Sequence, residues 1–279
     1  MIITTPHHTL DLSKRVHVMG ILNVTPDSFS DGGRLVTEKD LLKQVESMVN
    51  QGADILDIGG ESTRPYAEAV EEKEELRRVL PAISAIRKYF TTPISIDTAK
   101  AEVARQALEA GANIINDITA FQSDPDMIQV ALKHDVPVII MHMQGTPRTM
   151  QVNPSYDDVI GDIKSMLAAR IDWAEDQGFS RKKIIIDPGI GFGKTVGHNL
   201  TILKHLSEFS ALNCPILVGH SRKAFIGALL DIKDPSARDD ATSVLSALCV
   251  QNGASILRVH DVAKTVHAVR MAEAFIAGQ

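Results

Sequence analysis

Short apolar runs of strand length alternate along the chain with longer segments whose apolar residues recur at helical spacing. The first clear run, residues 17–23, ends in Asn23 and is followed by a polar segment with no strand or helix period. An apolar strand that delivers one polar side chain to its end, before a polar loop, is typical of α/β enzyme sites. Similar runs occur at 17–23, 55–59, 94–97, 114–118, 137–141, 184–186, 215–218 and 255–259.

The intervening segments predict helices with recognisable starts and ends. Thr37 and Asp40 fit a capping box, and apolar residues follow at helical intervals. The segment 71–89 begins with several glutamates, which suit the positive end of a helix dipole. Gly111 is a natural end for a helix over 100–110. Further helices are predicted over 157–177, 239–251 and 261–276.

Eight strands separated by helices predict parallel pairing with right-handed crossovers. An α/β fold of the closed (β/α)8 TIM-barrel type accommodates that number and leaves no strand edge exposed. Residues 1–12 predict a short N-terminal strand pair or arm, and without a linker we expect one domain over 1–279. An open doubly wound sheet is the alternative, but Asn23-Val24-Thr25-Pro26 is not its usual glycine-rich phosphate turn.

The active site of such a barrel lies at the carboxyl ends of the strands. Each predicted strand ends there in polar or charged residues, which divide by chemistry. Acceptor groups that suit the N–H-rich edge of a heterocycle end the third, fourth and sixth strands: Asp97, Asn116 and Asp187. Cations that suit an anionic oxygen cluster come from the last two strands and their ends: Lys223, Arg258 and His260. The long segments 24–36, 61–70 and 143–155 are typical of lids or substrate loops.

Taken singly, the carboxylates also have structural interpretations. Asp187 can begin an Asp-Pro-Gly turn, and Asp97 can cap the helix that follows it. Asp57 and Asp117 can be interior barrel groups held by neighbouring backbone. Together, however, so many polar groups at one mouth would repel one another or stay unsatisfied without a ligand.

Other polar residues have structural interpretations of their own. His142 and His220 are interpreted as hydrogen-bonded structural histidines rather than ligands. Glu61 and the acidic run 71–75 are expected in solvent. Ser221 can cap the short helix that follows it.

Composition narrows the classes of protein. A net charge of −6 argues against a nucleic-acid-binding protein, which would show a basic face. The two cysteines, Cys214 and Cys249, lie in apolar segments and are expected to be buried reduced thiols. No signal-peptide pattern begins the chain, and no apolar run approaches the roughly 20 residues that span a bilayer. We therefore expect a soluble cytoplasmic protein.

Phosphate-loop and metal signatures are weak. The glycine-rich run 189–194 lacks the Walker spacing, and no paired His/Cys spacing indicates a transition-metal site. Asn23 could hold only a weakly bound hard cation, most simply Mg²⁺ carried mainly by a diphosphate.

Seven motifs, in this order and spacing, make the chain resemble the dihydropteroate synthase family over nearly its whole length. They are Gly20-Ile21-Leu22-Asn23-Val24-Thr25-Pro26-Asp27-Ser28-Phe29-Ser30-Asp31-Gly32-Gly33, Asp57-Ile58-Gly59-Gly60-Glu61-Ser62-Thr63-Arg64-Pro65, Ser95-Ile96-Asp97-Thr98, Ile115-Asn116-Asp117-Ile118, Asp187-Pro188-Gly189-Ile190-Gly191-Phe192-Gly193-Lys194, Ser221-Arg222-Lys223 and Arg258-Val259-His260-Asp261.

The resemblance implies that 6-hydroxymethyl-7,8-dihydropterin diphosphate is joined to 4-aminobenzoate in folate synthesis, with Mg²⁺ bound by Asn23. It implies binding of the pterin diphosphate by Thr63, Asp97, Asn116, Asp187, Lys223, Arg258 and His260. It implies contacts with the second substrate, or lid roles, for Phe29, Ser62, Arg64, Pro65, Phe192 and Ser221. The family is usually dimeric, so a homodimer is expected. No side chain is expected to act as a covalent nucleophile.

One departure from the family concerns Ala224, where members often carry serine near the aminobenzoate carboxylate. Backbone N–H groups are then expected to bind more of that carboxylate. The residues also suit a dissociative route, in which the C–O bond breaks to a delocalised cation before the amine arrives.

Three alternatives stay open at this point. A methyltetrahydrofolate-binding methyltransferase could share the pterin-holding residues but has no use for a diphosphate cluster. A Schiff-base aldolase would use Lys223 as its nucleophile, which requires a lowered pKa. A non-catalytic pterin-binding homologue could carry the same motifs.

Overall fold

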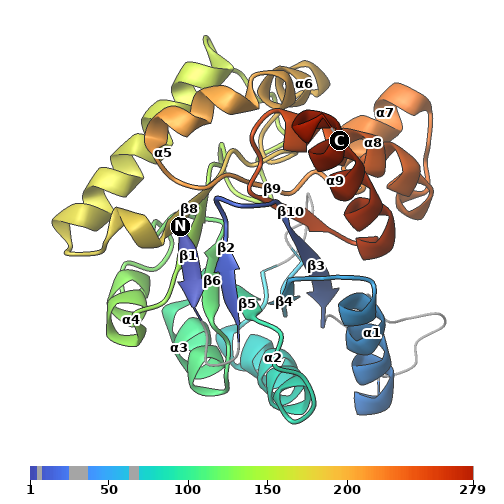
Figure 1. The fold of residues 1–279 in the computed structure, drawn as a ribbon. Coiled ribbons are helices and arrows are strands. Elements are labelled where there is room, and N and C mark those ends of the chain that lie inside the picture. Colours follow the sequence, from blue (N-terminus) through green and yellow to red (C-terminus); the bar gives the residue numbers. More distant parts are fainter. Residues whose placement is uncertain (5–7, 25–36, 63–68, 279) are drawn as a thin grey trace.

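The computed structural model describes residues 1–4, 8–24, 37–62 and 69–278, within which eight parallel strands form one curved sheet (Figure 1). They are β3 (His17–Asn23), β4 (Ile55–Gly59), β5 (Ile94–Asp97), β6 (Ile114–Asp117), β7 (Val138–Met141), β8 (Ile184–Asp187), β9 (Leu217–Val218) and β10 (Ile256–Val259). Their order is β8-β7-β6-β5-β4-β3-β10-β9. A parallel bridge between Ile186 and Ile216 brings the two outer strands together, so the sheet forms the predicted (β/α)8 barrel.

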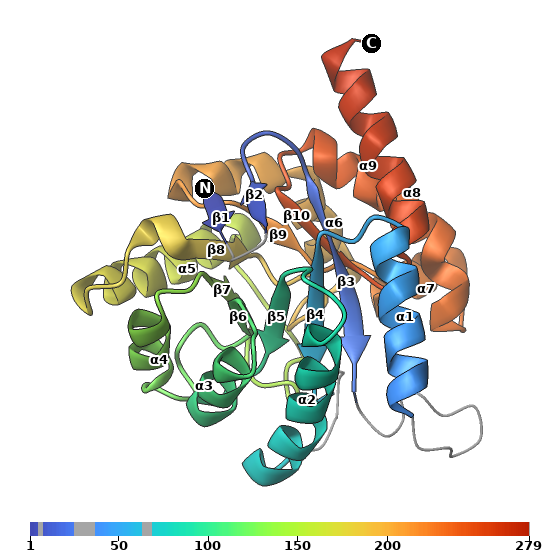
Figure 2. The ribbon, with the colours of Figure 1, turned by 60° about the horizontal axis from the view of Figure 1, so that its bottom comes forward.

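Helices cover the outside of the barrel (Figures 1 and 2). They are α1 (Glu38–Asn50), α2 (Glu72–Arg87), α3 (Ala101–Glu109), α4 (Met127–His134), α5 (Val159–Asp176), α6 (Val196–Lys204), α7 (Ala224–Leu230), α8 (Asp239–Gln251) and α9 (Val262–Ala277), with 3-10 turns η1 (Arg181–Lys183), η2 (Leu206–Leu212) and η3 (Pro235–Arg238). Thr37 caps α1 by accepting from the Asp40 N–H (3.2 Å), as predicted. Helices α4 and α6 lie outside the predicted helical segments. The capping box of α6 pairs Thr195 with His198 instead of the usual glutamate or glutamine.

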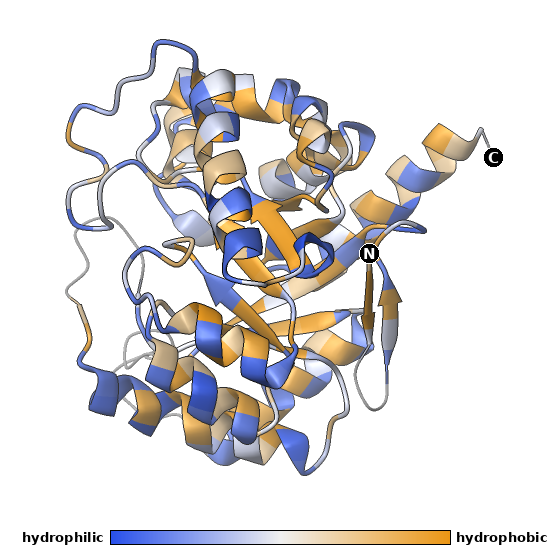
Figure 3. Ribbon diagram, turned by 90° about the vertical axis from the view of Figure 1, so that its left-hand side faces the viewer, coloured by the Kyte–Doolittle hydropathy of each residue, from blue (hydrophilic) through white to orange (hydrophobic). Residues whose placement is uncertain are grey.

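Among the described residues, the two larger parts of the hydrophobic core lie between the sheet and the helices and inside the barrel. Figure 3 shows that the strands of the barrel consist largely of hydrophobic residues. An antiparallel hairpin, β1 (Ile2–Thr4) and β2 (Thr9–Asp11), confirms the predicted N-terminal strand pair. Its buried residues Ile3 and Leu10 pack, with Leu12, on an interior layer made by Met19, Ile55, Ile114, Ile139, Ile185, Leu217 and Ile256.

This interior layer fixes the direction of the polar residues. Side chains alternate between the two faces of a strand, so residues two positions further along also point into the barrel. Those residues include Asp57, Asn116, Asp187 and Arg258. The hairpin therefore closes one end of the barrel, and the polar layer faces the other. Among the described residues, no helix is long and apolar enough to cross a membrane.

The hairpin is expected to contribute to stability. Leu10 is 6% exposed, and we expect Leu10→Ala to lower the free energy of unfolding by about 2–5 kcal/mol, because it leaves a cavity under the barrel. Ile2 lies on the same hairpin but is 61% exposed, so Ile2→Ala should change the free energy of unfolding by less than about 0.5 kcal/mol. Urea unfolding of both variants measures the difference; equal values would mean that the hairpin does not seal the core.

Candidate active site

A cavity of about 690 Å³ opens at the carboxyl ends of the strands. Eight predicted site residues line it: Asn23, Ser62, Asp97, Phe192, Ser221, Lys223, Arg258 and His260. Two more, Asn116 and Asp187, are buried in the polar layer beside it. The last four, Phe29, Thr63, Arg64 and Pro65, lie outside the described residues.

Arg258 links carboxylates from two strands at the base of this cavity. Its Nε donates to Asp57 on β4 (2.6 Å), and its Nη2 donates to Asp97 on β5 (2.6 Å). The amide of Asn116 lies 3.4 Å from both Asp57 oxygens. Burial raises the pKa of Asp97 to about 7, while the guanidinium of Arg258 opposes that shift. The base of the cavity is thus a desolvated, charge-paired acceptor cluster.

Asp57 corrects the interpretation from sequence. It is fully buried, but it is held by the Arg258 side chain rather than by neighbouring backbone, and through Arg258 it belongs to the site. Asp117 does behave as predicted, since it accepts from the N–H groups of Thr119 (2.8 Å) and Phe121 (2.7 Å). Asp97 is not a helix cap, because the N-cap of α3 is Lys100.

Asp187, Lys223 and Phe192 form the next part of the site. Asp187 accepts from the Gly189 N–H (2.7 Å), so it does begin the predicted turn, and burial raises its pKa to about 6. Lys223 Nζ lies 4.0 Å from the centre of the Phe192 ring, and burial lowers its pKa to about 8. A Cβ at Gly191, whose φ is +83°, would lie 2.8 Å from Lys223 Cδ. Glycine at that position therefore leaves room for the lysine stem.

Lys194, the last residue of the glycine-rich run 189–194, is buried beside the cavity. Its Nζ lies 3.0 Å from His142 Nδ1 and donates to the Phe192 carbonyl (2.9 Å). Burial lowers the pKa of Lys194 to about 7, and burial together with Lys194 lowers that of His142 to about 3. His142 and His220 both have hydrogen-bonding partners inside the protein, as the structural interpretation predicted.

The segment 143–155, predicted as a lid or substrate loop, packs against the loop after β8. Gln151 Nε2 donates to the Gly191 carbonyl (2.7 Å), and Met150 lies in a small apolar cluster with Phe192. Tyr156, the residue directly after this segment, donates from its hydroxyl to the Gly193 carbonyl (2.8 Å). This segment therefore braces the loop that carries Phe192. The other two long loops lie largely outside the described residues.

Two further expectations are wrong. Glu61 and the acidic run 71–75 were expected in solvent. Glu71 and Glu72 are exposed, but Glu75 is fully buried, and both Glu75 and the partly exposed Glu61 accept hydrogen bonds from Lys100 Nζ (2.6 and 2.5 Å). Ser221 does not cap α7, whose N-cap is Lys223. Instead its Oγ lies 3.0 Å from His260 Nδ1 and accepts from the His260 N–H (3.2 Å), which ties the ends of β9 and β10 together.

Asn23 ends β3 on the cavity wall. Its Oδ1 and the Asp97 Oδ2 both lie within 4 Å of the position that a Cβ on Gly59 would take. Among the described residues, no group of three His, Cys, Asp or Glu could hold a metal ion. An amide oxygen is nevertheless a fitting ligand for a hard cation whose other ligands come from a bound substrate and water.

Comparisons with known proteins agree with this geometry. The model of a family described as pterin binding enzyme matches residues 19–260. The dihydropteroate synthase of Synechocystis sp. (strain ATCC 27184 / PCC 6803 / Kazusa) is 48% identical over 264 residues, covering 95% of this chain and 91% of that protein. The dihydropteroate synthase of Escherichia coli (strain K12) is 47% identical over 271 residues, covering 97% and 95%.

Solved structures extend the likeness to three dimensions. A Yersinia pestis dihydropteroate synthase in complex with a sulfonamide drug has a TM-score of 0.94 and 44% identity, covering 99% of this chain and 100% of that one. A Xanthomonas albilineans dihydropteroate synthase with 4-aminobenzoic acid has a TM-score of 0.90 and 44% identity, covering 96% of both chains. The chain therefore belongs to the pterin-binding enzymes and, within them, to the dihydropteroate synthase family.

Proposed function

We propose that this cavity joins 6-hydroxymethyl-7,8-dihydropterin diphosphate to 4-aminobenzoate, giving 7,8-dihydropteroate and diphosphate. The division of the cavity by chemistry carries the proposal. Buried acceptors lie on β5, β6 and β8, and the cations lie on β10 and in the segments that follow β9 and β10. A ring with N–H donors and a diphosphate would each find complementary groups.

The acceptor side would hold the pterin. Asp97, Asn116 and Asp187 are each less than 10% exposed, so hydrogen bonds to them form away from competing water. Arg258, which already contacts Asp97, would pack on the ring and reach the diphosphate together with His260. Thr63, outside the described residues, is proposed for the same diphosphate.

The chain supplies charge stabilisation rather than a covalent partner in this proposal. C–O cleavage to a delocalised cation needs stabilisation of the departing diphosphate and a site that excludes water. Lys223 and Arg258 supply positive charge beside the cavity, and Asp187 supplies a nearby carboxylate. When bound, Mg²⁺ held by the diphosphate and Asn23 would neutralise part of the charge on the leaving group.

The second substrate would lie beside Phe192 and Ser221. Ala224 lines the cavity, and the backbone N–H groups there are the donors that we propose for the aminobenzoate carboxylate. Ser62 lines the same cavity. The lid roles proposed for Phe29, Arg64 and Pro65 concern segments outside the described residues.

A homodimer and a cytoplasmic location are part of the proposal. Large apolar side chains are at least half exposed on neighbouring helices α8 and α9: Val244, Met271, Phe275 and Ile276. Figure 2 shows that the C-terminal end of α9 extends beyond the barrel. Exposed apolar surface of this kind is typical of subunit interfaces. Sedimentation velocity tests the proposal and should give the mass of a dimer.

The proposed cytoplasmic location rests on the cysteines. Cys214 and Cys249 are free and buried, which fits a reducing compartment, and cell fractionation tests this location.

An assay of diphosphate release tests the proposed activity. Release should require both the pterin diphosphate and 4-aminobenzoate, and dihydropteroate should appear in equal amount. Because the pKa of Lys223 is lowered, a Schiff-base aldolase would also be consistent with that lysine. Borohydride treatment with substrate should therefore leave the protein mass unchanged; a covalent adduct at Lys223 would contradict the proposal.

Substrate binding is expected to depend on pH with two limbs. Because the pKa values of Asp187 and Asp97 are about 6 and about 7, affinity for the pterin diphosphate should rise with pH through these values, as both carboxylates become full acceptors. Because the pKa of Lys223 is about 8, affinity should fall again as the lysine loses its charge. Calorimetric titration between about pH 5 and 9 measures both limbs.

Two controls separate the protein groups from the ligand. The pterin alcohol without diphosphate should keep the acid limb, which would then not come from the diphosphate. Lys223→Ala should remove the alkaline limb and lower activity by at least about tenfold. An affinity that does not change with pH would contradict both assignments.

A further inference from the structure

Helix α8 buries a stripe of polar residues where a helix of this kind normally buries apolar ones. Asp239, Thr242 and Ser246 are 8%, 2% and 0% exposed. Their spacing of three and four residues places them on one face of the helix. That face packs against the segment 220–223, which connects β9 to α7.

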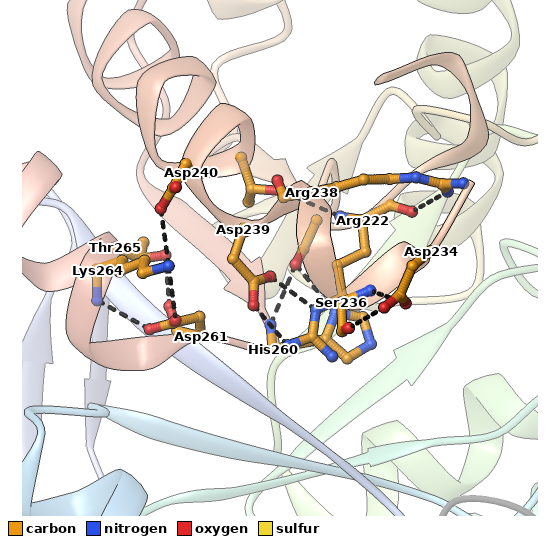
Figure 4. A network of polar contacts seen from close by, with 12 residues as sticks. Arg222, Asp234, Ser236, Arg238, Asp239, Asp240, His260, Asp261, Lys264 and Thr265 are labelled. Carbon is orange, nitrogen blue, oxygen red and sulfur yellow. Dashed lines mark hydrogen bonds and ion pairs between the residues drawn. The ribbon is translucent and has the colours of Figure 1, made fainter. Parts of the chain in front are cut away.

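The stripe holds alternate residues of that segment. His220 Nε2 lies 2.9 Å from Ser246 Oγ and 3.1 Å from the Thr242 carbonyl. The Arg222 N–H donates to Thr242 Oγ1 (3.2 Å), and its guanidinium donates twice to the Asp239 carboxylate (both 2.7 Å; Figure 4). These contacts between α8 and the segment therefore all involve His220 or Arg222.

The intervening residues, Ser221 and Lys223, line the cavity, as does Arg222 between them. Ser221 lies 3.0 Å from His260, and Lys223 lies over the Phe192 ring. One side of the segment is thus bound to α8, and the other carries two of the side chains proposed to bind substrate.

The backbone between these two residues is strained. Arg222 has a φ of 57°, a left-handed conformation that is unfavourable for a residue with a long side chain. Such a conformation persists where surrounding contacts determine it. Besides the contacts with α8, the Arg222 carbonyl accepts from Arg238 Nη1 (3.0 Å), so the main chain is held on both sides.

We propose that Asp239 is a positioning residue: by pairing with Arg222 it holds the left-handed turn that directs Ser221 and Lys223 into the cavity. The kinetic part of this inference rests on the proposed function, since it assumes that both side chains bind substrate. Its geometric part, that Asp239 orders the turn, does not.

Asp239→Asn tests the proposal, with Asp240→Asn as the matched control. Asp240 is the next residue of the same helix turn, but its side chain is 87% exposed and pairs with Lys264 (2.7 Å; Figure 4). Both substitutions remove one negative charge. Asp239→Asn, but not Asp240→Asn, should speed amide hydrogen exchange over residues 221–224, because the turn opens more often when Arg222 loses its charged partner.

Steady-state kinetics should show the same contrast. We expect Asp239→Asn to lower kcat/KM for 4-aminobenzoate by about tenfold, because misplaced binding groups slow the reaction. The KM for the pterin diphosphate should rise by a smaller factor, because Lys223 is only one of its proposed ligands and Asp97, Asn116 and Asp187 lie on other strands. Asp239→Glu, which keeps the carboxylate, should recover part of the loss.

The outcomes separate this inference from the proposed activity. If the wild type shows no turnover, the activity is wrong, and hydrogen exchange still decides whether Asp239 orders the turn. If Asp239→Asn does not fold, Thr242→Val, which keeps the side-chain shape, should show the same effects at smaller size. Exchange and kinetics indistinguishable from those of Asp240→Asn would overturn the proposal.

Discussion

Asp187→Asn is expected to lower kcat/KM by at least about tenfold while leaving the fold intact. The carboxylate has one oxygen bound by the Gly189 N–H (2.7 Å), and an asparagine can keep that bond through its own oxygen. The other position would then carry an NH2 group, which donates where the pterin requires an acceptor. Steady-state kinetics with both substrates varied measures the loss.

Asp117→Asn provides the control for this substitution. Asp117 is also fully buried and ends the strand β6, but its oxygens are taken by Thr119 and Phe121. The same chemical change there should lower thermal stability and leave both KM values unchanged. If Asp187→Asn kept full activity, Asp187 would not be a pterin ligand.

Arg258→Met is expected to lower the free energy of unfolding by about 3–5 kcal/mol and to abolish measurable activity. The substitution removes the cation between Asp57 and Asp97. The Asp57 side chain is fully buried, and that of Asp97 is 8% exposed. Two carboxylates would remain in a low-dielectric site without compensation. Urea unfolding at pH 8 and pH 5 should show a smaller loss at the lower pH, where protonation of Asp97 relieves the repulsion.

Neutralising both partners separates charge from packing. In the Arg258→Met background, adding Asp57→Asn and Asp97→Asn should restore most of the lost stability, because no unpaired charge remains. Activity should stay lost, since the proposed ligands are gone. A single Arg258→Met variant as stable as the wild type would show that the carboxylates do not depend on Arg258.

Much of the barrel and of its polar mouth could be predicted from sequence. The strands are apolar runs bounded by turns, and parallel strands bring their carboxyl ends to one edge. Asp97, Asn116, Asp187 and Arg258 could therefore be placed together, although they lie far apart along the chain. The N-terminal hairpin could be predicted as a strand pair, but its packing against the end of the barrel could not.

Partners that depend on long-range pairing could not be predicted. Asp57 has no local signal that distinguishes it from Asp117, because its partner Arg258 lies 201 residues away. Glu75 is buried against Lys100, the N-cap residue of α3, and nothing within the acidic run itself indicates this partner. A lysine in a glycine-rich run gives no sign that it will be buried against His142, as Lys194 is.

The central claim is that one cavity receives the pterin ring on its acceptor side and the diphosphate on its cationic side. A crystal structure of the protein with the pterin diphosphate tests it most directly. We predict ring nitrogens within hydrogen-bond distance of Asp97, Asn116 and Asp187, with the diphosphate near Asn23 and His260. A ligand bound elsewhere, or with its diphosphate on the carboxylates, would contradict the claim.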